Sequence, residues 1–229
     1  MIGALSPTWI VRVICGFTVA LCAVVALGTS SASAQAVWKS SGIVVGLINF
    51  LILLLTFRSV FRRVHKVLHA DGWWFPLLDG EWTGEVHSNW PRVHRMMLAA
   101  RGEAPAFNTL TEELPPGQPG ERTNVTAQIA SNLFEILIEL RIPGTNRLSR
   151  SVFVRPQWCK PSLPRLYYTY EQIDTGNVSA TDAARHFGAA IVDYDTGTDE
   201  LRGEYWTQRQ GVRGLNTAGF ITLSRTKRT

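Results

Sequence analysis

Short segments of alternating polar and apolar residues recur between residues 77 and 225, separated by breaks rich in glycine, asparagine and aspartate. A period of two is typical of a β-strand with one buried face, and such breaks are typical of turns. Because the turns are short and leave no helix-length gaps, we predict an antiparallel meander. Eight segments fit the pattern: residues 77–86, 121–130, 133–142, 150–155, 165–171, 186–194, 200–209 and 217–225.

An antiparallel domain of this size folds as a sandwich or a closed barrel, and eight strands favour a small all-β barrel. Such a barrel is just wide enough to be filled by side chains or to hold one small ligand, and closure removes exposed sheet edges. If Ser131–Asn132 is a bulge in one long strand, seven strands remain. Residues 93–101 fit either an extra strand or a short helix, and residues 102–120 fit a long exposed loop.

The first quarter of the chain has a different composition. Residues 1–57 carry only two charged side chains, Arg12 and Lys39, whereas the rest of the chain holds all 18 acidic residues. Two apolar runs lie here, residues 9–28 and 41–57, and the second can extend to about residue 60. Since about 20 apolar residues cross a bilayer, we predict a two-helix transmembrane hairpin within residues 1–66, followed by a barrel domain over residues 67–229.

Four basic residues follow the second run directly: Arg58, Arg62, Arg63 and Lys66. Basic residues beside a membrane span mark the cytoplasmic side, so both termini and the barrel domain are expected in the cytoplasm. A second interpretation concerns residues 1–34. The motif "ASAQA" after an apolar run also resembles a signal-peptidase site, in which case the first run is cleaved and the second remains.

Small residues repeat at helical spacing in both runs. Gly16 and Ala20 lie four apart in the first, and Gly42 and Gly46 lie four apart in the second, with Asn49 on the same face. Such spacing lets helices approach closely, and a buried Asn can hydrogen-bond across the contact. We expect these residues to pack helices against each other, either within the hairpin or between protomers.

Sequence motifs of catalysis and metal binding are missing from the chain. The three cysteines form no CxxC pair, and His65 and His69 have helical spacing but no third ligand in sight. We therefore expect neither an enzyme nor a bound metal or cofactor. The net charge of +5 is partly explained by the basic residues that flank the second run, so we expect no nucleic-acid polymer as a partner.

The strand pattern does point to binding. Tyr205 and Arg209 share a face with Leu201, which we expect to point inward, so that Arg209 would lie at a barrel mouth with Tyr205 below it. An arginine near an aromatic ring suits a phosphate with an attached base. The alternative is that the aromatic residues simply fill the core. The same two interpretations apply to the other candidates, Tyr168 and Tyr170 on one face, Trp82 as their expected neighbour, and His186 beside Gly188 and Ala190.

Four segments, in the order "LDGEWTGEVHSNWP", "LYYTYE", "HFGAAIVDY" and "LRGEYWTQRQGVRG", follow the two apolar runs and their basic flank. Together they resemble the two-transmembrane, β-strand-rich effectors of bacterial CBASS anti-phage operons. The resemblance implies a β-barrel on a two-helix anchor in the bacterial inner membrane. It also implies that the barrel binds a cyclic dinucleotide, self-associates and disrupts the membrane. Trp82, Tyr168, Tyr170, His186, Tyr205 and Arg209 lie in the matching segments.

Overall fold

The computed structural model of the protein describes Arg12, residues 15–20, Ala23 and residues 34–159, 163–176, 183–210 and 213–228. The chain divides into two compact units. The N-terminal unit comprises Met1–Leu77 together with Ser131–Glu135, and the barrel unit comprises Leu78–Ala130 and Ile136–Thr229.

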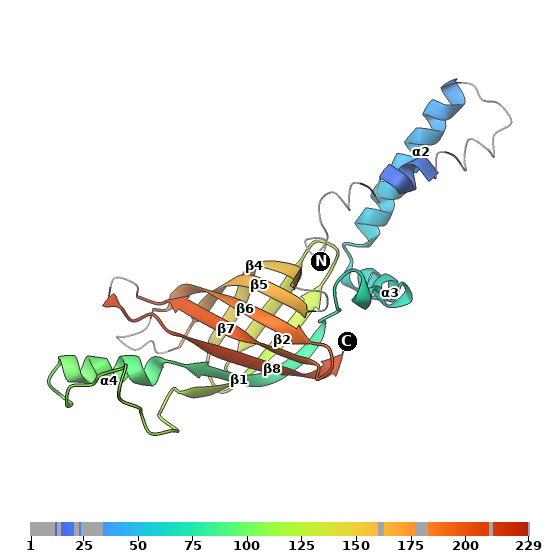
Figure 1. The fold of residues 1–229 in the computed structure, drawn as a ribbon. Coiled ribbons are helices and arrows are strands. Elements are labelled where there is room, and N and C mark those ends of the chain that lie inside the picture. The colour runs from blue at the N-terminus through green and yellow to red at the C-terminus, as the bar shows by residue number, and fades with distance from the viewer. Residues whose placement is uncertain are drawn as a thin grey trace. The chain divides into compact units, whose positions relative to one another are not determined.

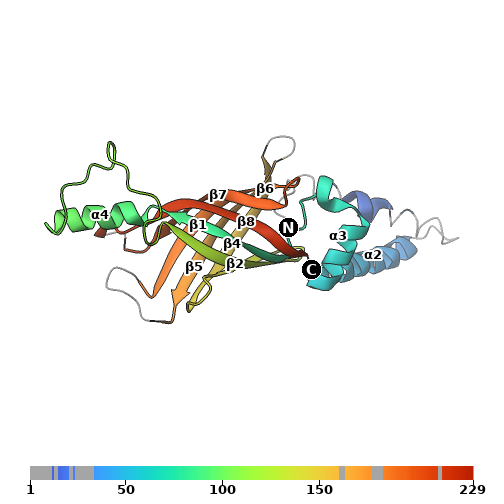
Figure 2. The same ribbon diagram turned by 90° about the horizontal axis from the view of Figure 1, so that it is seen from below.

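The barrel unit is a closed, antiparallel, eight-stranded β-barrel, in which the strands follow one another in chain order and β8 pairs with β1 (Figures 1 and 2). This confirms the predicted barrel. The strands are β1 (Gly80–Ser88), β2 (Arg122–Ser131), β3 (Ile136–Arg141), β4 (Arg147–Cys159), β5 (Leu163–Asp174), β6 (Arg185–Asp195), β7 (Glu200–Gln208) and β8 (Ala218–Arg228).

The structure decides between the alternatives for two segments. Residues 132–135 form a turn between β2 and β3 rather than a bulge, because the Asn132 side-chain oxygen accepts the backbone N–H groups of Phe134 and Glu135. The segment after β1 is a helix, α4 (Trp90–Ala100), with Pro91 in its first turn, where proline is tolerated. The loop that follows is mostly exposed, as predicted, and Arg92 Nη1 holds it by donating to the Thr109 and Glu112 carbonyls.

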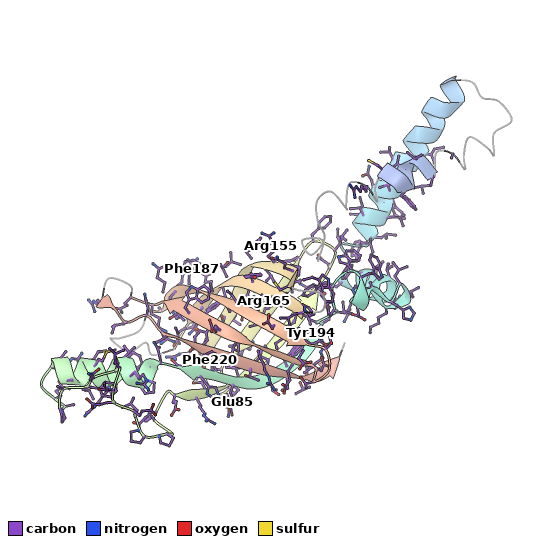
Figure 3. The ribbon with its side chains drawn as sticks, viewed as in Figure 1. Glu85, Arg155, Arg165, Phe187, Tyr194 and Phe220 are labelled. Carbon is purple, nitrogen blue, oxygen red and sulfur yellow. The ribbon has the colours of Figure 1, made fainter. Side chains whose placement is uncertain are left out.

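Side chains alternate between the two faces of the barrel wall. On β7, Leu201 and Thr207 are buried inside, whereas Trp206 between them is 46% exposed. Figure 3 shows the outward set, with Phe187 and Phe220 projecting from the wall. The inward set therefore determines whether the interior is filled or open.

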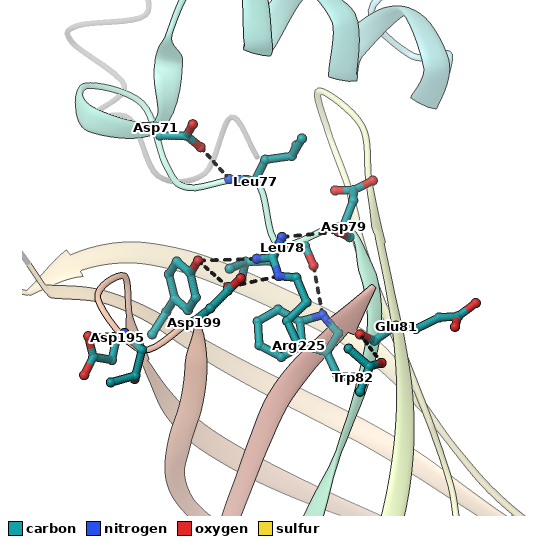
Figure 4. A network of polar contacts seen from close by, with 12 residues as sticks. Asp71, Leu77, Leu78, Asp79, Glu81, Trp82, Asp195, Asp199 and Arg225 are labelled. Atoms are coloured by element: carbon teal, nitrogen blue, oxygen red, sulfur yellow. Dashed lines mark hydrogen bonds and ion pairs between the residues drawn. The ribbon is translucent and has the colours of Figure 1, made fainter. Parts of the chain in front are cut away.

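The interior is filled at the end where β1 begins (Figure 4). Arg225 is 4% exposed and forms an ion pair with Asp199, with 3.0 Å between Nε and Oδ1. Its guanidinium lies 4.5 Å from the ring centroid of Trp82, and the Tyr194 hydroxyl donates to Asp199 at 2.7 Å. The Trp82 indole N–H donates to the Leu78 carbonyl. We call these four side chains, Trp82, Tyr194, Asp199 and Arg225, the barrel plug.

The N-terminal unit contains α2 (Ala34–Leu54), α3 (Arg58–Val67) and the short 3-10 helix η2 (Ala70–Gly72). The expected span at residues 41–60 is interrupted, because α2 ends at Leu54 and the Thr56 N–H and hydroxyl both bond to the Leu53 carbonyl. Within the described residues, no helix taken alone has the length and hydropathy needed to cross a bilayer. The bent pair Gly42–Leu54 and Arg58–Val67, with 103° between its halves, meets the criterion by length and composition. Most of the first apolar run, residues 9–28, lies outside the described residues. Within this run, the described residues 15–20 are helical.

Candidate functional site: a cavity at the open end of the barrel

A cavity of about 320 Å³ occupies the barrel interior at the end opposite the plug. It lies where β1 and β7 end and where β4 and β8 begin, so its walls come from strands distant in sequence. Its volume is at the lower end of the range of roughly 300–1,000 Å³ typical of small-molecule sites. Its polar and aromatic lining includes Ser88, Trp90, Arg147, Ser149, Tyr168, Tyr170, Gln172, Tyr205, Thr207 and Arg209.

One wall is aromatic. Tyr168 and Tyr170 of β5 lie with their ring centroids 6.0 Å apart, and both are 8% exposed. The ring of Tyr170 lies against Gly188 of β6, where an added Cβ would come within 2.4 Å of the tyrosine Cζ. The absence of a side chain at Gly188 therefore lets the ring of Tyr170 lie flat on the barrel wall.

The opposite part of the lining pairs a phenol with a cation. Tyr205 and Arg209 lie on one face of the chain at and just beyond the end of β7, and both line the cavity. The Tyr205 hydroxyl hydrogen-bonds to Ser88 of β1, and the Nε atom of Arg209 is buried. Arg209 also lies close enough to Tyr170 for its charge to favour the ionised form of that phenol.

A second arginine lies at the same end of the barrel. Arg147, the first residue of β4, forms an ion pair with Asp174 at the end of β5, with 2.7 Å between Nε and Oδ2. The other oxygen of Asp174 accepts the Gly176 N–H at 2.9 Å. Both bonds hold the pKa of Asp174 below its ordinary value, and the hydrogen bond from the Gly176 backbone has the larger effect. Asp174 is therefore a carboxylate that fixes the position of Arg147 in the cavity wall.

The mouth is bordered by the start of α4. The Trp90 indole packs on Gly120, which has a positive φ of 79°, and a Cβ at Gly120 would lie 2.8 Å from Trp90 Cδ1. Trp90 also stacks on His94, with 5.8 Å between ring centroids. The long loop after α4 therefore returns to the cavity at Gly120 and adds an aromatic surface to its rim.

The electrostatics of the cavity suit a bound anion. Burial is the largest influence on the pKa values of Tyr168, Tyr170 and Tyr205, and it raises all three. These phenols therefore stay neutral at physiological pH. Arg209, just beyond the end of β7, supplies positive charge, whereas the charge of Arg147 on β4 is balanced by its ion pair with Asp174. The Ser149 hydroxyl and the Gln172 amide add hydrogen-bonding groups to the lining, whereas the Thr207 hydroxyl is hydrogen-bonded to Thr217.

Four of the six residues singled out from the sequence, Tyr168, Tyr170, Tyr205 and Arg209, line this one cavity. The other two lie elsewhere. Trp82 is fully buried in the plug at the opposite end, where it contacts Arg225 and Tyr194 rather than Tyr168 and Tyr170. His186 is buried on β6, outside the cavity lining.

The sequence pattern missed Arg147 and Trp90. Arg147 falls in a break rich in turn residues, and its strand changes face at an irregularity between Ser151 and Phe153. Because of that shift, alternation counted back from Phe153 assigns Arg147 to the wrong side. Trp90 is the first residue of α4, and only Asn89 separates it from β1, so neither a helical nor a strand period indicates its direction.

The residues predicted to pack helices are exposed in this chain. Gly42, Gly46 and Asn49 of α2, and Gly16 and Ala20 in the helical stretch 15–20, all lie on uncovered surface. A Cβ added at Gly16, Gly42 or Gly46 would meet no atom within 4 Å. Packing of these residues within the hairpin is thus not seen among the described residues.

Comparisons with protein-family models and with curated proteins found no match to this chain. In the part of the chain that the structure describes, no three His, Cys, Asp or Glu side chains gather into a group that could hold a metal ion.

Proposed function

We propose that the protein is an anti-phage defence effector of the bacterial inner membrane that binds a cyclic dinucleotide in the barrel cavity. Binding drives self-association, and the assembly disrupts the membrane. The observation that carries the proposal is the cavity with two arginines at its open end and three neutral tyrosines in its lining. The resemblance of four sequence segments to membrane effectors of CBASS operons supports the same conclusion.

The cavity chemistry selects for an anion that carries flat rings. A cyclic dinucleotide has two phosphodiester groups, each with one negative charge, and two bases with exposed π-faces. Guanidinium groups bind phosphate oxygens through charge-assisted hydrogen bonds, and tyrosine rings stack on bases. Arg147 and Arg209 would bind the phosphates, whereas Tyr168, Tyr170 and Tyr205 would contact a base.

The volume of the cavity limits how such a ligand enters. About 320 Å³ is small for a whole cyclic dinucleotide. We therefore propose that one nucleotide enters the barrel and that the second stays at the mouth, where Trp90 offers a further stacking surface. The ring of phosphates would then lie at the level of the two arginines.

The membrane part of the proposal rests on the N-terminal unit. Its apolar runs would anchor the protein as a multi-pass hairpin, with both termini and the barrel in the cytoplasm. The uncovered face at Gly42, Gly46 and Asn49 is available for contacts between protomers. Ligand binding shifts the protein towards an assembly only if the assembled state binds the ligand more tightly.

Calorimetric titration of the full-length protein in detergent with a panel of cyclic dinucleotides tests the proposal. We expect saturable binding of one member of the panel, together with an increase in particle mass by light scattering. Arg209→Ala should abolish binding, because the phosphate loses a cation in the cavity lining. Arg202→Ala on the outer face of β7, a matched loss of charge, should leave the affinity unchanged.

The runner-up function is a membrane-anchored barrel that acts as a scaffold or as a lipocalin-like carrier without toxicity. A carrier of apolar molecules would bind them regardless of Arg209, and a scaffold would bind no small molecule. In either case Asn49→Leu would be harmless. If no cyclic dinucleotide binds, or if Arg209→Ala binds as tightly as the wild type, the proposed function is wrong.

A further inference from the structure

Helix α3 leaves the direction of α2 at nearly a right angle. The axes of Gly42–Leu54 and Arg58–Val67 differ by 103°, and Figure 1 shows the turn between the two helices. If the apolar part of α2 enters a bilayer along its normal, a helix at this angle lies close to the membrane plane. The basic residues would then be spread along the lipid surface instead of extending away from it.

Three sides of α3 have different chemistry. Phe61 and His65 are each 1% exposed and pack on Trp74, with 5.7 Å between the ring centroids of Phe61 and Trp74. The His65 Nε2–H donates to the Phe75 carbonyl at 2.9 Å, which ties the helix to the chain that follows. This buried side sets the rotation of α3 about its own axis within the N-terminal unit.

The other two sides are half-buried to exposed, with Val60, Arg62 and Val64 half-buried. Val60, Val64 and Val67 recur at the spacing i, i+4, i+7 and form an apolar strip, and Val67 is 75% exposed. Arg58, Arg62 and Lys66 recur at the spacing i, i+4, i+8 on the polar side. Arg63 lies between the strip and the polar side, because it precedes Val67 by four residues.

We propose that α3 is an interfacial helix that binds the surface of a bilayer rich in anionic phospholipids. The valine strip would enter the boundary between headgroups and acyl chains, and the arginines and lysine would contact lipid phosphates. This inference rests on the membrane part of the proposed function. It adds a lipid-binding site, with its own residues, that does not depend on the barrel cavity.

Charge complementarity identifies the occupant as anionic lipid. The first 70 residues contain no Asp or Glu, and Asp71, the first acidic residue of the chain, lies 3.9 Å from the buried His65. Helix α3 therefore carries four basic residues in a stretch without acidic ones. Basic residues close to an anionic membrane surface each favour binding, and an apolar strip bordered by cations is typical of helices that lie in the interface. Phe57 and Trp73, which flank the helix, are 56% and 47% exposed and suit the headgroup region.

Environment-sensitive fluorescence of the full-length protein tests this assignment. A fluorophore is attached at Val67→Cys, or at Ser59→Cys on the polar side of the same helix, after the three native cysteines are replaced by serine. The protein is reconstituted in vesicles of phosphatidylcholine alone or mixed with phosphatidylglycerol. We expect lipid-borne quenchers to quench the label at residue 67 strongly in the anionic vesicles, and the label at residue 59 weakly in both mixtures.

Charge variants provide the second readout. Arg58→Gln combined with Arg63→Gln should lower the equilibrium constant for docking of α3 on the anionic surface by about 30-fold, as measured by quenching of the label at residue 67. Each cation near the surface contributes a factor of roughly five to that constant. Arg101→Gln combined with Arg122→Gln, two exposed positions in the barrel unit, removes the same charge and should leave quenching unchanged.

A label at Phe50→Cys in α2 distinguishes failure of the α3 inference from failure of the membrane anchor. If residue 50 is quenched but residue 67 is not, the inference is wrong and the membrane anchor stands. If neither is quenched, the membrane part of the proposed function fails and the inference fails with it. A third outcome is that the label at residue 67 becomes shielded from water as protein density rises, without being quenched by the lipid-borne quenchers. That result would assign the valine strip to a contact with a second copy of the chain and would also overturn the inference.

Discussion

At the scale of single residues, the arginines of the barrel have two distinct roles. Arg209 and Arg147 lie at the open end and line the cavity, whereas Arg225 lies in the plug, enclosed by Trp82, Tyr194 and Asp199. A cation that lines a cavity can contribute to ligand affinity, and a cation that is paired and buried contributes to the fold. Substitutions should separate these roles.

Arg147→Gln should weaken binding of the cyclic dinucleotide by roughly 10- to 100-fold, the effect of losing one charge-assisted hydrogen bond. Arg150→Gln is the matched control, because Arg150 lies on the same strand, is 61% exposed and pairs with Glu139 on the outer face. Calorimetry on both variants measures the effect. Equal affinities in the two variants would exclude Arg147 from the site.

Arg225→Leu should lower the free energy of unfolding by about 3 kcal/mol, because it leaves the Asp199 carboxylate without its partner. Arg202→Leu removes an exposed ion pair with Glu200 and should cost at most about 1 kcal/mol. Chemical denaturation gives both values. Ligand affinity below the melting temperature should be the same in both variants, and a selective loss of affinity in Arg225→Leu would show that the plug contributes to binding.

At the scale of elements, closure of the barrel depends on close strand contacts. At Gly84 of β1, an added Cβ would lie 1.9 Å from the Thr222 carbonyl oxygen and 2.9 Å from Leu223 Cα of β8. These are backbone atoms of the strand that seals the barrel, so they cannot rotate away. The glycine is required here because the two strands approach closely.

Gly84→Ala should therefore destabilise the protein by about 1–3 kcal/mol through overpacking. Gly72→Ala, the same chemical change at a position with no atom within 4 Å of the new Cβ, should stay within about 0.5 kcal/mol of the wild type. Thermal denaturation followed by circular dichroism compares them. A melting temperature for Gly84→Ala equal to that of the wild type would mean that β1 and β8 are less tightly paired than described.

The antiparallel barrel and the shared faces of Tyr168 with Tyr170 and of Tyr205 with Arg209 were predictable, because an unbroken period of two determines which side chains lie on one face. The strand number stayed open between seven and eight until the structure showed the turn at residues 132–135. Arg147 was not predictable, because the irregularity in β4 changes which residues face inward. The role of Trp82 was also hidden. It shares an inward face with other strand residues, and only the closed barrel brings it to Arg225, which lies 143 positions later in the chain.

At the scale of the whole molecule, the buried tyrosines link ligand site and stability. Burial raises the pKa of Tyr168 and Tyr170 in the folded state, whereas in the unfolded chain both titrate near their ordinary pKa of 10.0. Above that pH the unfolded chain has lost protons that the folded protein still holds. Stability should therefore be intact below about pH 10 and fall as the pH rises further.

The expected fall is up to roughly 1.4 kcal/mol per pH unit for each tyrosine. The double variant Tyr168→Phe/Tyr170→Phe should have a correspondingly shallower dependence. Urea denaturation at a series of pH values between neutral and strongly alkaline measures both slopes. Parallel curves for the wild type and the double variant would show that these phenols titrate freely in the folded protein.

The contrast between the charge-poor start of the chain and the alternating segments that follow predicts two parts, the second from residue 67. In the structure the compact units divide between Leu77 and Leu78. The turn between α2 and α3 was not predictable, because the apolar run continues through Leu55 and Phe57 without a proline or glycine. The right-angle bend arises from local hydrogen bonds at Thr56 and from packing of Phe61 and His65 on Trp74. Neither contact has a signal in hydropathy.

The structure of the full-length protein with a bound cyclic dinucleotide would test most directly whether the barrel interior is the ligand site. We predict density for one nucleotide inside the cavity, with its base against Tyr168, Tyr170 or Tyr205 and its phosphate at Arg209 and Arg147. Density for the ligand only on the outer wall of the barrel, or an interior closed by protein side chains in its presence, would contradict the proposed function.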